Sequence, residues 1–337
     1  MQLREYLKLA RSFNAVLTAV SPVMGAIAME QYNLVHLSLL FIIGFFGHTY
    51  GFVLNDILDY KIDKDSKDIS DRPLISGTIT LRKAWVFALA SLVIALLIAI
   101  YISYTTGTWY ALIILILSAG FITLYDLISK KLPLTDIILG IGVSLFVLYG
   151  AAIQVPRFMD ITLLAGIVSI LGGIQVLFMN IVAGGLKDIE NDYQKGANTL
   201  AVKLGVRVQN HLLQVSTAFK AVAYGIQAID IILVFTPFFI IASFTSITTL
   251  RTIQWVLLLL VSITMLFFSY RLLTQPRFER GTIRKFIGLH YYTNFALVPI
   301  LLMTLTPWAI ILVFIPALGF VLNNLILHGS PLQPKTM

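Results

Sequence analysis

Two acidic segments of the chain contain the residue types that bind divalent metal ions. Residues 56–71 hold six of the 16 Asp and Glu residues, and residues 188–192 hold three more. Both follow strongly apolar stretches, and a carboxylate next to lipid is costly, so this concentration needs a chemical reason. Proteins bind Mg²⁺ through one or two carboxylates, while water and substrate phosphate complete the octahedron. The two segments therefore predict a Mg²⁺ site for a phosphate-bearing ligand.

The first segment has the spacing of a helical row. Asn55, Asp59 and Asp63 recur every four residues, and Asp56 lies three residues before Asp59. On a helix these four side chains lie close enough to line one cavity. Like charges at this spacing repel one another, so the row opposes its own helix unless a cation neutralises it.

The second segment repeats this spacing with Asp188 and Asp192, whereas Glu190 falls on the opposite side of the same helix. A solvated acidic helix end is the alternative interpretation, but it does not explain why the spacing occurs twice. We therefore expect four carboxylates to act as metal ligands and catalytic groups: Asp59, Asp63, Asp188 and Asp192.

Basic residues near these segments are candidates for binding phosphate. Arg72 lies in a short loop with turn-forming residues at both ends, and Lys130 follows another apolar stretch. An Arg side chain grips phosphate through two parallel hydrogen bonds. The alternative for each residue is the general excess of Lys and Arg in the cytoplasmic loops of membrane proteins.

The elements that position these residues are membrane spans. Of the 337 residues 58% are hydrophobic and 12% are charged, which excludes a disordered chain. The absence of cysteine excludes disulfides and thiolate metal sites. A span needs about 20 apolar residues. We predict nine or ten spans, because the last two form either two helices or one broken helix: 13–29, 34–54, 84–104, 109–126, 134–153, 162–183, 218–243, 253–273, 287–304 and 307–327. Residues 184–217 are predicted to be a loop and an amphipathic helix.

The distribution of Lys and Arg predicts the orientation. With the N-terminus inside, 22 of the 24 basic residues fall in inside segments, and only Arg157 and Arg251 lie outside. Positive residues accumulate on the cytoplasmic side, so both acidic segments are expected there, in a multi-pass protein of the cell membrane. The same loops account for the net charge of +8, and we expect no nucleic-acid partner.

These motifs resemble those of the UbiA-type intramembrane prenyltransferases. The residues that carry the resemblance are Asn55, Asp56, Asp59, Asp63, Arg72–Gly77, Tyr125, Lys130, Asp188, Glu190, Asp192, Gly196, Thr199 and Leu200. The similarity covers about residues 8–210, and the helices of 218–327 extend the pattern. Asn191 replaces the usual glycine of the second motif.

The resemblance implies an all-α helical bundle in a single domain, 1–337, with a lateral or central cavity and a cytoplasmic-side active site. It implies that a prenyl diphosphate donor binds through Mg²⁺, and that the prenyl group passes to a small hydrophobic or amphipathic acceptor within the membrane lipid. It also implies substrate contacts from Arg11, Asn55, Asp56, Arg72, Tyr125 and Lys130.

The motifs do not specify which molecule accepts the prenyl group. An aromatic or quinone precursor is slightly favoured because that group of family members is large. A glyceryl-ether lipid or a tetrapyrrole is the alternative with the same chemistry. A membrane terpene cyclase would ionise the same donor, and ten spans with an internal repeat also occur in secondary transporters. A transporter carries its charges at mid-membrane, whereas these acidic residues lie at helix ends, which favours an enzyme.

Overall fold

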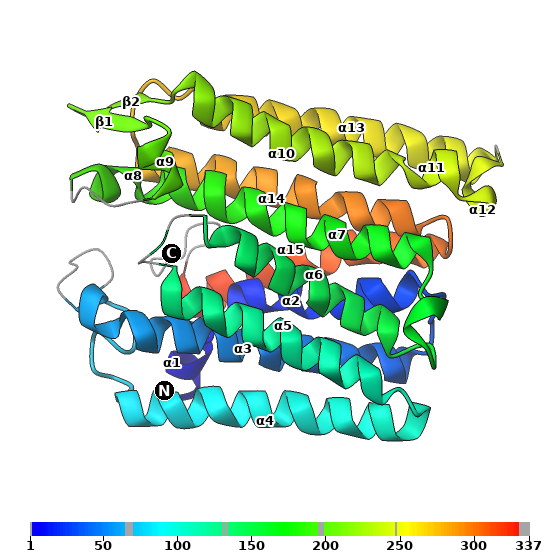
Figure 1. The fold of residues 1–337 in the computed structure, drawn as a ribbon. Helices are drawn as coiled ribbons and strands as arrows, with labels where there is room; N and C mark the ends of the chain where they lie inside the picture. Colours follow the sequence, from blue (N-terminus) through cyan, green and yellow to red (C-terminus); the bar gives the residue numbers. More distant parts are fainter. Residues whose placement is uncertain are drawn as a thin grey trace. The chain divides into compact units, whose positions relative to one another are not determined.

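The chain is helical almost throughout (Figure 1). The computed structural model describes residues 2–64, 70–129, 132, 134–194, 199–246 and 248–329, without the side chains of residues 2, 62, 63 and 194. Its elements are α1 (Gln2–Leu9), α2 (Ser12–Ile27), α3 (Leu34–Asp63), α4 (Leu81–Thr106), α5 (Trp109–Ile128), α6 (Asp136–Ala152), η2 (Phe158–Asp160), α7 (Leu163–Leu177), η3 (Phe178–Gly184), α8 (Gly185–Gln194), α9 (Leu200–Lys203), β1 (Arg207–Gln209), β2 (Leu212–Gln214), α10 (Thr217–Phe235), α11 (Pro237–Ile240), α12 (Ala242–Thr245), α13 (Thr249–Leu273), α14 (Arg280–Leu302), η4 (Pro307–Ile310) and α15 (Ile311–His328). The predicted all-α class is confirmed, apart from one small hairpin.

Many of these helices have the length and composition of membrane spans. Among the described residues, seven are long and apolar enough to cross a membrane, and α2 and α6 are shorter apolar helices. The helix α14 has 23 residues but does not belong to this set, and it includes the buried polar residues His290 and Asn294. In the C-terminal region, α14 ends at Leu302 and η4 begins at Pro307, so this region forms two helices.

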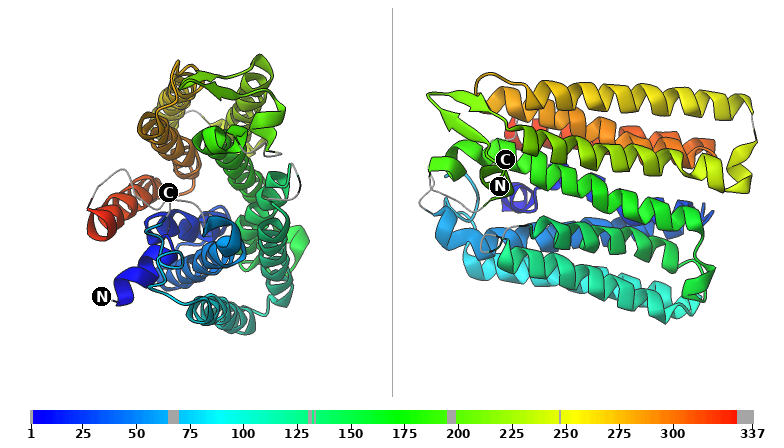
Figure 2. Two further views of the ribbon diagram at one scale, coloured as in Figure 1. Left: turned by 90° about the vertical axis from the view of Figure 1, so that its left-hand side faces the viewer. Right: turned by 45° about the horizontal axis from the view of Figure 1, so that its top comes forward.

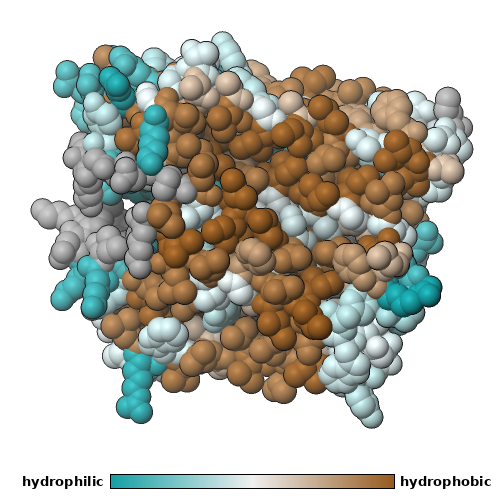
Figure 3. Space-filling view, in the orientation of Figure 1, coloured by the Kyte–Doolittle hydropathy of each residue, from teal (hydrophilic) through white to brown (hydrophobic). Residues whose placement is uncertain are grey.

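Apolar side chains cover much of the face that Figure 3 shows, and many apolar side chains of the helices are exposed. Leu97 of α4 is 60% exposed, Ile263 of α13 is 62% exposed, and Ile326 of α15 is 69% exposed. A protein in water rarely leaves continuous apolar surface of this kind uncovered, whereas lipid solvates it. The protein is therefore a multi-pass membrane protein.

The chain forms two compact units. Unit 1 consists of Met1–Leu127, Leu145–Ala165 and Phe314–Met337, and unit 2 consists of Ile128–Ser144 and Gly166–Val313. Within unit 1, α3 packs between α2 and α4, and within unit 2, α13 packs along α14 (Figure 2). Each unit is described by itself below.

Small residues let the helices of unit 1 approach closely. A Cβ atom on Gly44 of α3 would lie 2.5 Å from the Cα of Ala19 in α2, so only glycine allows this contact. A Cβ on Gly150 of α6 would collide with the carbonyl oxygen of Pro22 in α2. Gly44 therefore allows α2 and α3 to pack closely. Gly47 and Gly51 have room for a methyl group, with nearest atoms at 3.6 and 3.4 Å.

Polar side chains define where several helices begin. The Asn33 side chain accepts a hydrogen bond from the backbone of His36 at 3.0 Å at the start of α3, and Thr80 caps α4 in the same manner. Capping of this type satisfies backbone N–H groups that have no partner inside the helix. The α3 helix then continues without interruption to Asp63, so the first acidic motif lies on its last turns.

Residues 184–217 form more structure than the sequence predicts. They include the end of a π-helical segment, two short α-helices and the antiparallel hairpin β1–β2, whose register pairs Arg207 with Gln214. Asn210 and His211 connect the strands with φ values of 47° and 60°. A two-residue hairpin turn of this kind requires positive φ at both positions, and Asn tolerates it well. Val208 and Leu213 of the hairpin are buried in the core of unit 2.

Candidate active site

The end of α3 presents the first motif in the helical arrangement that its spacing predicts. Asn55, Asp56 and Asp59 all lie in α3, with Asp56 buried and the other two partly exposed. Ile57 and Val53 are buried against Leu9 and Leu74, which fixes the rotation of the helix about its axis. The packing of the apolar face therefore decides which polar side chains of this helix remain accessible.

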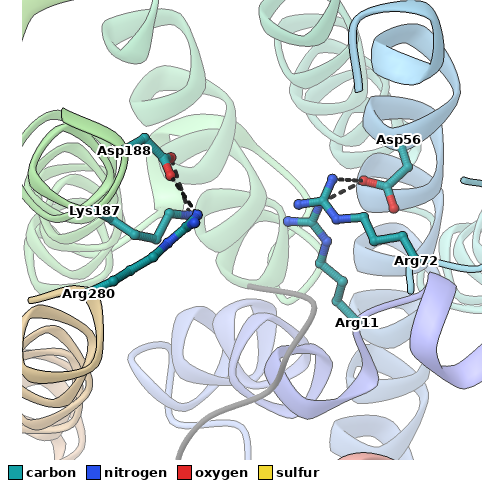
Figure 4. Close-up of polar contacts among 6 residues, drawn as sticks. All are labelled: Arg11, Asp56, Arg72, Lys187, Asp188 and Arg280. Atoms are coloured by element: carbon teal, nitrogen blue, oxygen red, sulfur yellow. Dashed lines mark hydrogen bonds and ion pairs between the residues drawn. The ribbon is translucent and has the colours of Figure 1, made fainter. Parts of the chain in front are cut away.

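Asp56 forms ion pairs with two arginines from different parts of unit 1 (Figure 4). Its Oδ1 lies 2.6 Å from Nη2 of Arg11 and 3.4 Å from Nη1 of Arg72, and its side chain is only 6% exposed. Removing one partner of a buried pair leaves an uncompensated charge, which typically costs about 3–5 kcal/mol. We infer that Asp56 positions the two arginines.

The backbone around each arginine explains why it reaches Asp56. Arg11 connects α1 to α2 with φ 46° and ψ 47°, a left-handed conformation that turns the chain sharply, and its guanidinium lies 5.1 Å from the ring centre of Phe52. Arg72 opens a tight turn in which the Pro73 carbonyl accepts hydrogen bonds from Thr78 Oγ1 and from the Ile79 amide, both at 3.0 Å. The predicted turn at Arg72–Gly77 is thus present.

A further carboxylate, Asp126, lies beside the first motif. Its Oδ1 accepts a hydrogen bond from Nδ2 of Asn55 at 3.2 Å, and the side chain is buried at 8% exposure. A second contact between the same helices joins the hydroxyls of Tyr50 and Thr123 at 2.9 Å. Asp126 is not among the residues predicted from the sequence. It could have been predicted, because a carboxylate inside an apolar span is costly and this one lies next to Tyr125, a predicted substrate contact.

The second motif follows a change of helix type in unit 2. The α-helix α7 continues into the π-helix η3 and then into α8, which carries Asp188, Glu190 and Asp192. Short π-helical segments often occur at functional sites because they change the rotation of the residues that follow. Leu186 and Ile189 of α8 are fully buried in the core of unit 2, so the acidic residues lie on its other faces.

Asp188 and Glu190 have different neighbours, as their helical positions predict. Asp188 lies 3.5 Å from Nζ of Lys187 and 3.4 Å from Nη2 of Arg280, while Glu190 lies 3.8 Å from Nδ1 of His211. The Asp188 side chain is 42% exposed, so it remains accessible to a ligand. Arg280, at the start of α14, was not predicted from the sequence because it lies 92 residues further along the chain, in the basic segment 271–285.

The structure brings some predicted residues together and leaves others undecided. It joins Arg11, Asp56 and Arg72, and it places Asn55 one turn before Asp59. The Asp63 side chain and all of Lys130 lie outside the described residues. Among the described side chains of either unit, no three acidic or histidine groups gather as a preformed metal site. Asp59, Asp188 and Asp192 are partly exposed oxygen donors, a donor type that suits Mg²⁺.

A family model supports the identification. The model of the UbiA prenyltransferase family matches residues 16–289, which include both acidic motifs. The chain belongs to the UbiA prenyltransferase family. The predicted enzyme class, a prenyltransferase, is thereby confirmed.

Three similar proteins from archaea carry the same name. The digeranylgeranylglyceryl phosphate synthase of Saccharolobus solfataricus is 28% identical over 256 residues, which cover 72% of this chain and 86% of the relative. The synthase of the same name from Sulfolobus acidocaldarius is 31% identical over 61% of this chain and 71% of its own. The Methanocaldococcus jannaschii synthase is 28% identical over 60% of this chain and 69% of its own.

Solved structures have the same fold. A UbiA homologue from Aeropyrum pernix K1 superposes with a TM-score of 0.64 at 18% identity, covering 85% of this chain and 94% of that one. A UbiA homologue from Archaeoglobus fulgidus, bound to GPP and Mg²⁺, gives a TM-score of 0.59 at 17% identity and covers 87% of this chain and 99% of that one. These similarities confirm the helical fold.

Proposed function

We propose that the protein transfers a prenyl group from a prenyl diphosphate to a phosphorylated glyceryl ether, in a Mg²⁺-dependent reaction within the membrane. The observation that carries this proposal is the similarity to digeranylgeranylglyceryl phosphate synthases, which extends over 72% of the chain in one case. It favours the glyceryl-ether alternative over the aromatic or quinone precursor that the sequence analysis slightly preferred. The preference for an aromatic acceptor depended only on the large number of family members that use one. That number contains no information about this chain.

The donor would be held by the two acidic motifs. Asp59 and Asp63 of α3, and Asp188 and Asp192 of α8, would bind Mg²⁺, and Asn55 would support the first pair. The partial exposure of Asp59, Asp188 and Asp192 supports this assignment, because a ligand must reach their oxygens. The Mg²⁺ cofactor is supported by the Archaeoglobus fulgidus homologue, whose structure contains GPP and Mg²⁺. When bound, the metal would neutralise the diphosphate and act as a Lewis acid.

The cations near the first motif would stabilise the leaving group. Negative charge accumulates on the diphosphate as its bond to carbon breaks, and fixed positive groups lower the energy of that state. Arg11 and Arg72 are held by Asp56, so they need little reorganisation to act. Tyr125 and Lys130 are proposed as further contacts of the donor.

The chemical step forms an ether. The acceptor hydroxyl oxygen bonds to C1 of the prenyl group while the bond between C1 and the diphosphate oxygen breaks. The diphosphate leaves with the bonding electrons, and the hydroxyl proton passes to water or to a basic group. Apolar helices around the prenyl chain would protect the allylic cation from water.

We further propose that residues 1–337 form a single prenyltransferase domain with nine or ten spans and with both motifs on the cytoplasmic side. The distribution of Lys and Arg supports this orientation, since only Arg157 and Arg251 fall in the loops assigned to the outside. Accessibility labelling of single cysteines provides a direct test, because the chain has no cysteine of its own. A cysteine in place of exposed Lys285 should be labelled from the cytoplasmic side only.

The activity itself can be tested with purified protein in lipid vesicles. We expect geranylgeranyl diphosphate and a geranylgeranylglyceryl phosphate acceptor to give a doubly alkylated ether, detected by mass spectrometry, with one diphosphate released for each ether. Removal of Mg²⁺ with EDTA should abolish both products. An aromatic acid alkylated in place of the glyceryl ether, or diphosphate released with a cyclised hydrocarbon, would contradict the proposed acceptor.

A further inference from the structure

Two cations from distant parts of unit 2 meet at the carboxylate of Asp188 (Figure 4). Lys187 precedes it in α8, and Arg280 is the first residue of α14, 92 positions further along the chain. The three side chains are 25%, 33% and 42% exposed, in the order Lys187, Arg280 and Asp188. This group is thus open to a ligand, yet it is held by two different helices.

The surrounding segments contain more positive charge than their carboxylates balance. The described residues of 187–216 and 271–285 include eight basic residues and four acidic ones. The basic residues are Lys187, Lys203, Arg207, Arg271, Arg277, Arg280, Arg284 and Lys285. Asp188 and Asp192 are the proposed metal ligands, so they would be neutralised by Mg²⁺ when the site is loaded. An excess of positive charge then remains, which favours a second anion.

The hairpin determines where Arg280 lies. The amide of Phe278 donates a hydrogen bond to the carbonyl of His211 at 2.8 Å, and the amide of Leu213 donates to the carbonyl of Pro276 at 3.1 Å. Leu212 also forms a bridge with Arg277, so the segment before α14 extends the hairpin. Phe278 and Leu213 are buried in the same core as α8. The segment before α14 is therefore held against the hairpin, and both pack on the core that includes α8.

A second arginine continues this surface along α14. Arg284 follows Arg280 by four residues, which places it on the same face of the helix one turn further on, and it is partly buried. Lys285 is exposed and lies about 100° further around the helix. Two arginines one turn apart on a helix can bind the oxygens of one phosphate through several charge-assisted hydrogen bonds.

We propose that Lys187, Arg280 and Arg284 bind the phosphate group of the acceptor, a glyceryl ether phosphomonoester. This inference rests on the proposed function. Unit 2 would then select the acceptor by its phosphate, a group that an unphosphorylated aromatic precursor does not have. The diphosphate of the donor has related chemistry, so the test must separate the two substrates.

The test compares Arg280→Gln and Arg284→Gln with the wild-type protein in vesicles. We expect the KM for the phosphorylated glyceryl ether to rise roughly 10- to 100-fold, because each variant loses a charged hydrogen-bond donor. The KM for the prenyl diphosphate should stay within about twofold of the wild-type value. A twofold change corresponds to less free energy than one exposed ion pair typically contributes. The same glyceryl ether without its phosphate should react poorly with the wild type and no worse with the variants.

Three further measurements make the result decisive. Lys285→Gln removes the same charge from the neighbouring position of α14 and should leave both KM values unchanged. Arg280→Lys keeps the charge and should recover part of the lost affinity. Lys187→Gln provides a variant outside α14 if the arginine variants fail to fold.

Two results would overturn the phosphate site. One is an equal rise of the donor KM, which would assign these cations to the diphosphate. The other is unchanged discrimination between the phosphorylated and dephosphorylated acceptors. By contrast, a wild-type protein that forms no ether with either acceptor would refute the proposed function itself.

Discussion

Each unit contains an aspartate that contacts two cations, and the two groups differ in how deeply they are buried. In unit 1, Asp56 is 6% exposed and pairs with Arg11 and Arg72, whereas in unit 2, Asp188 is 42% exposed and lies near Lys187 and Arg280. The buried carboxylate cannot exchange its partners for a ligand without leaving charge uncompensated. The exposed carboxylate can do so at little cost. The comparison teaches that similar charge patterns in the two motifs have different roles.

The largest expected loss of activity concerns two aspartates that, like Asp188, are partly exposed. We expect Asp59→Asn and Asp192→Asn each to lower Mg²⁺-dependent turnover by roughly 100-fold or more, because a proposed metal site loses a charged ligand. The rate of diphosphate release measures this directly. Asp160→Asn is the matched control, since Asp160 is paired only with the exposed Arg157 among the described residues. Wild-type turnover in either variant would refute the metal assignment.

The comparison itself is tested by neutralising Asp56 and Asp188 separately. We expect Asp56→Asn to lower the free energy of unfolding by about 3–5 kcal/mol, because two partly buried arginines lose their counterion. Asp188→Asn should change it by less than about 1 kcal/mol, since that group is exposed, while activity falls. Thermal unfolding in detergent, scored by helical circular dichroism, distinguishes them. Equal losses of stability would show that burial does not separate the two roles.

The hydrogen bond between Asn55 and Asp126 should contribute less. We expect Asp126→Leu to cost about 1–3 kcal/mol of stability, because the partly buried Asn55 amide loses its acceptor. Asp126→Asn retains an oxygen acceptor and should cost less than about 1 kcal/mol. The same unfolding assay applies to both variants. If Asp126→Leu unfolds like the wild type, the contact does not hold α3 against α5.

Glu190→Gln should have the smallest effect. Glu190 lies on a different face of α8 from Asp188 and Asp192, and its contact with His211 is long and exposed. Turnover should therefore remain within about fivefold of the wild type. A fivefold change corresponds to the largest free energy that an exposed ion pair typically contributes. A loss as large as that of Asp192→Asn would place Glu190 among the metal ligands and contradict the helical assignment.

The sequence predicted the helices that consist of apolar stretches. It was less informative for a helix whose first turns are charged and for very short strands. The span expected at 34–54 is the apolar part of α3, and the motif continues the same helix to Asp63. By contrast, α14 begins at Arg280, seven residues before the expected span, because its first turns are basic rather than apolar. The β1–β2 hairpin has only three residues per strand, too few for alternation to be visible.

The sequence by itself determined the family, the membrane-spanning class and the helical rows of carboxylates, because these depend on residue type and on spacing along the chain. The tertiary structure decided which charged groups meet. Asp56 contacts arginines 45 residues before it and 16 residues after it, and Asp188 contacts one 92 residues after it. Such contacts depend on how the apolar faces of helices pack, which sets the rotation of each helix and hence which polar side chains are buried or exposed.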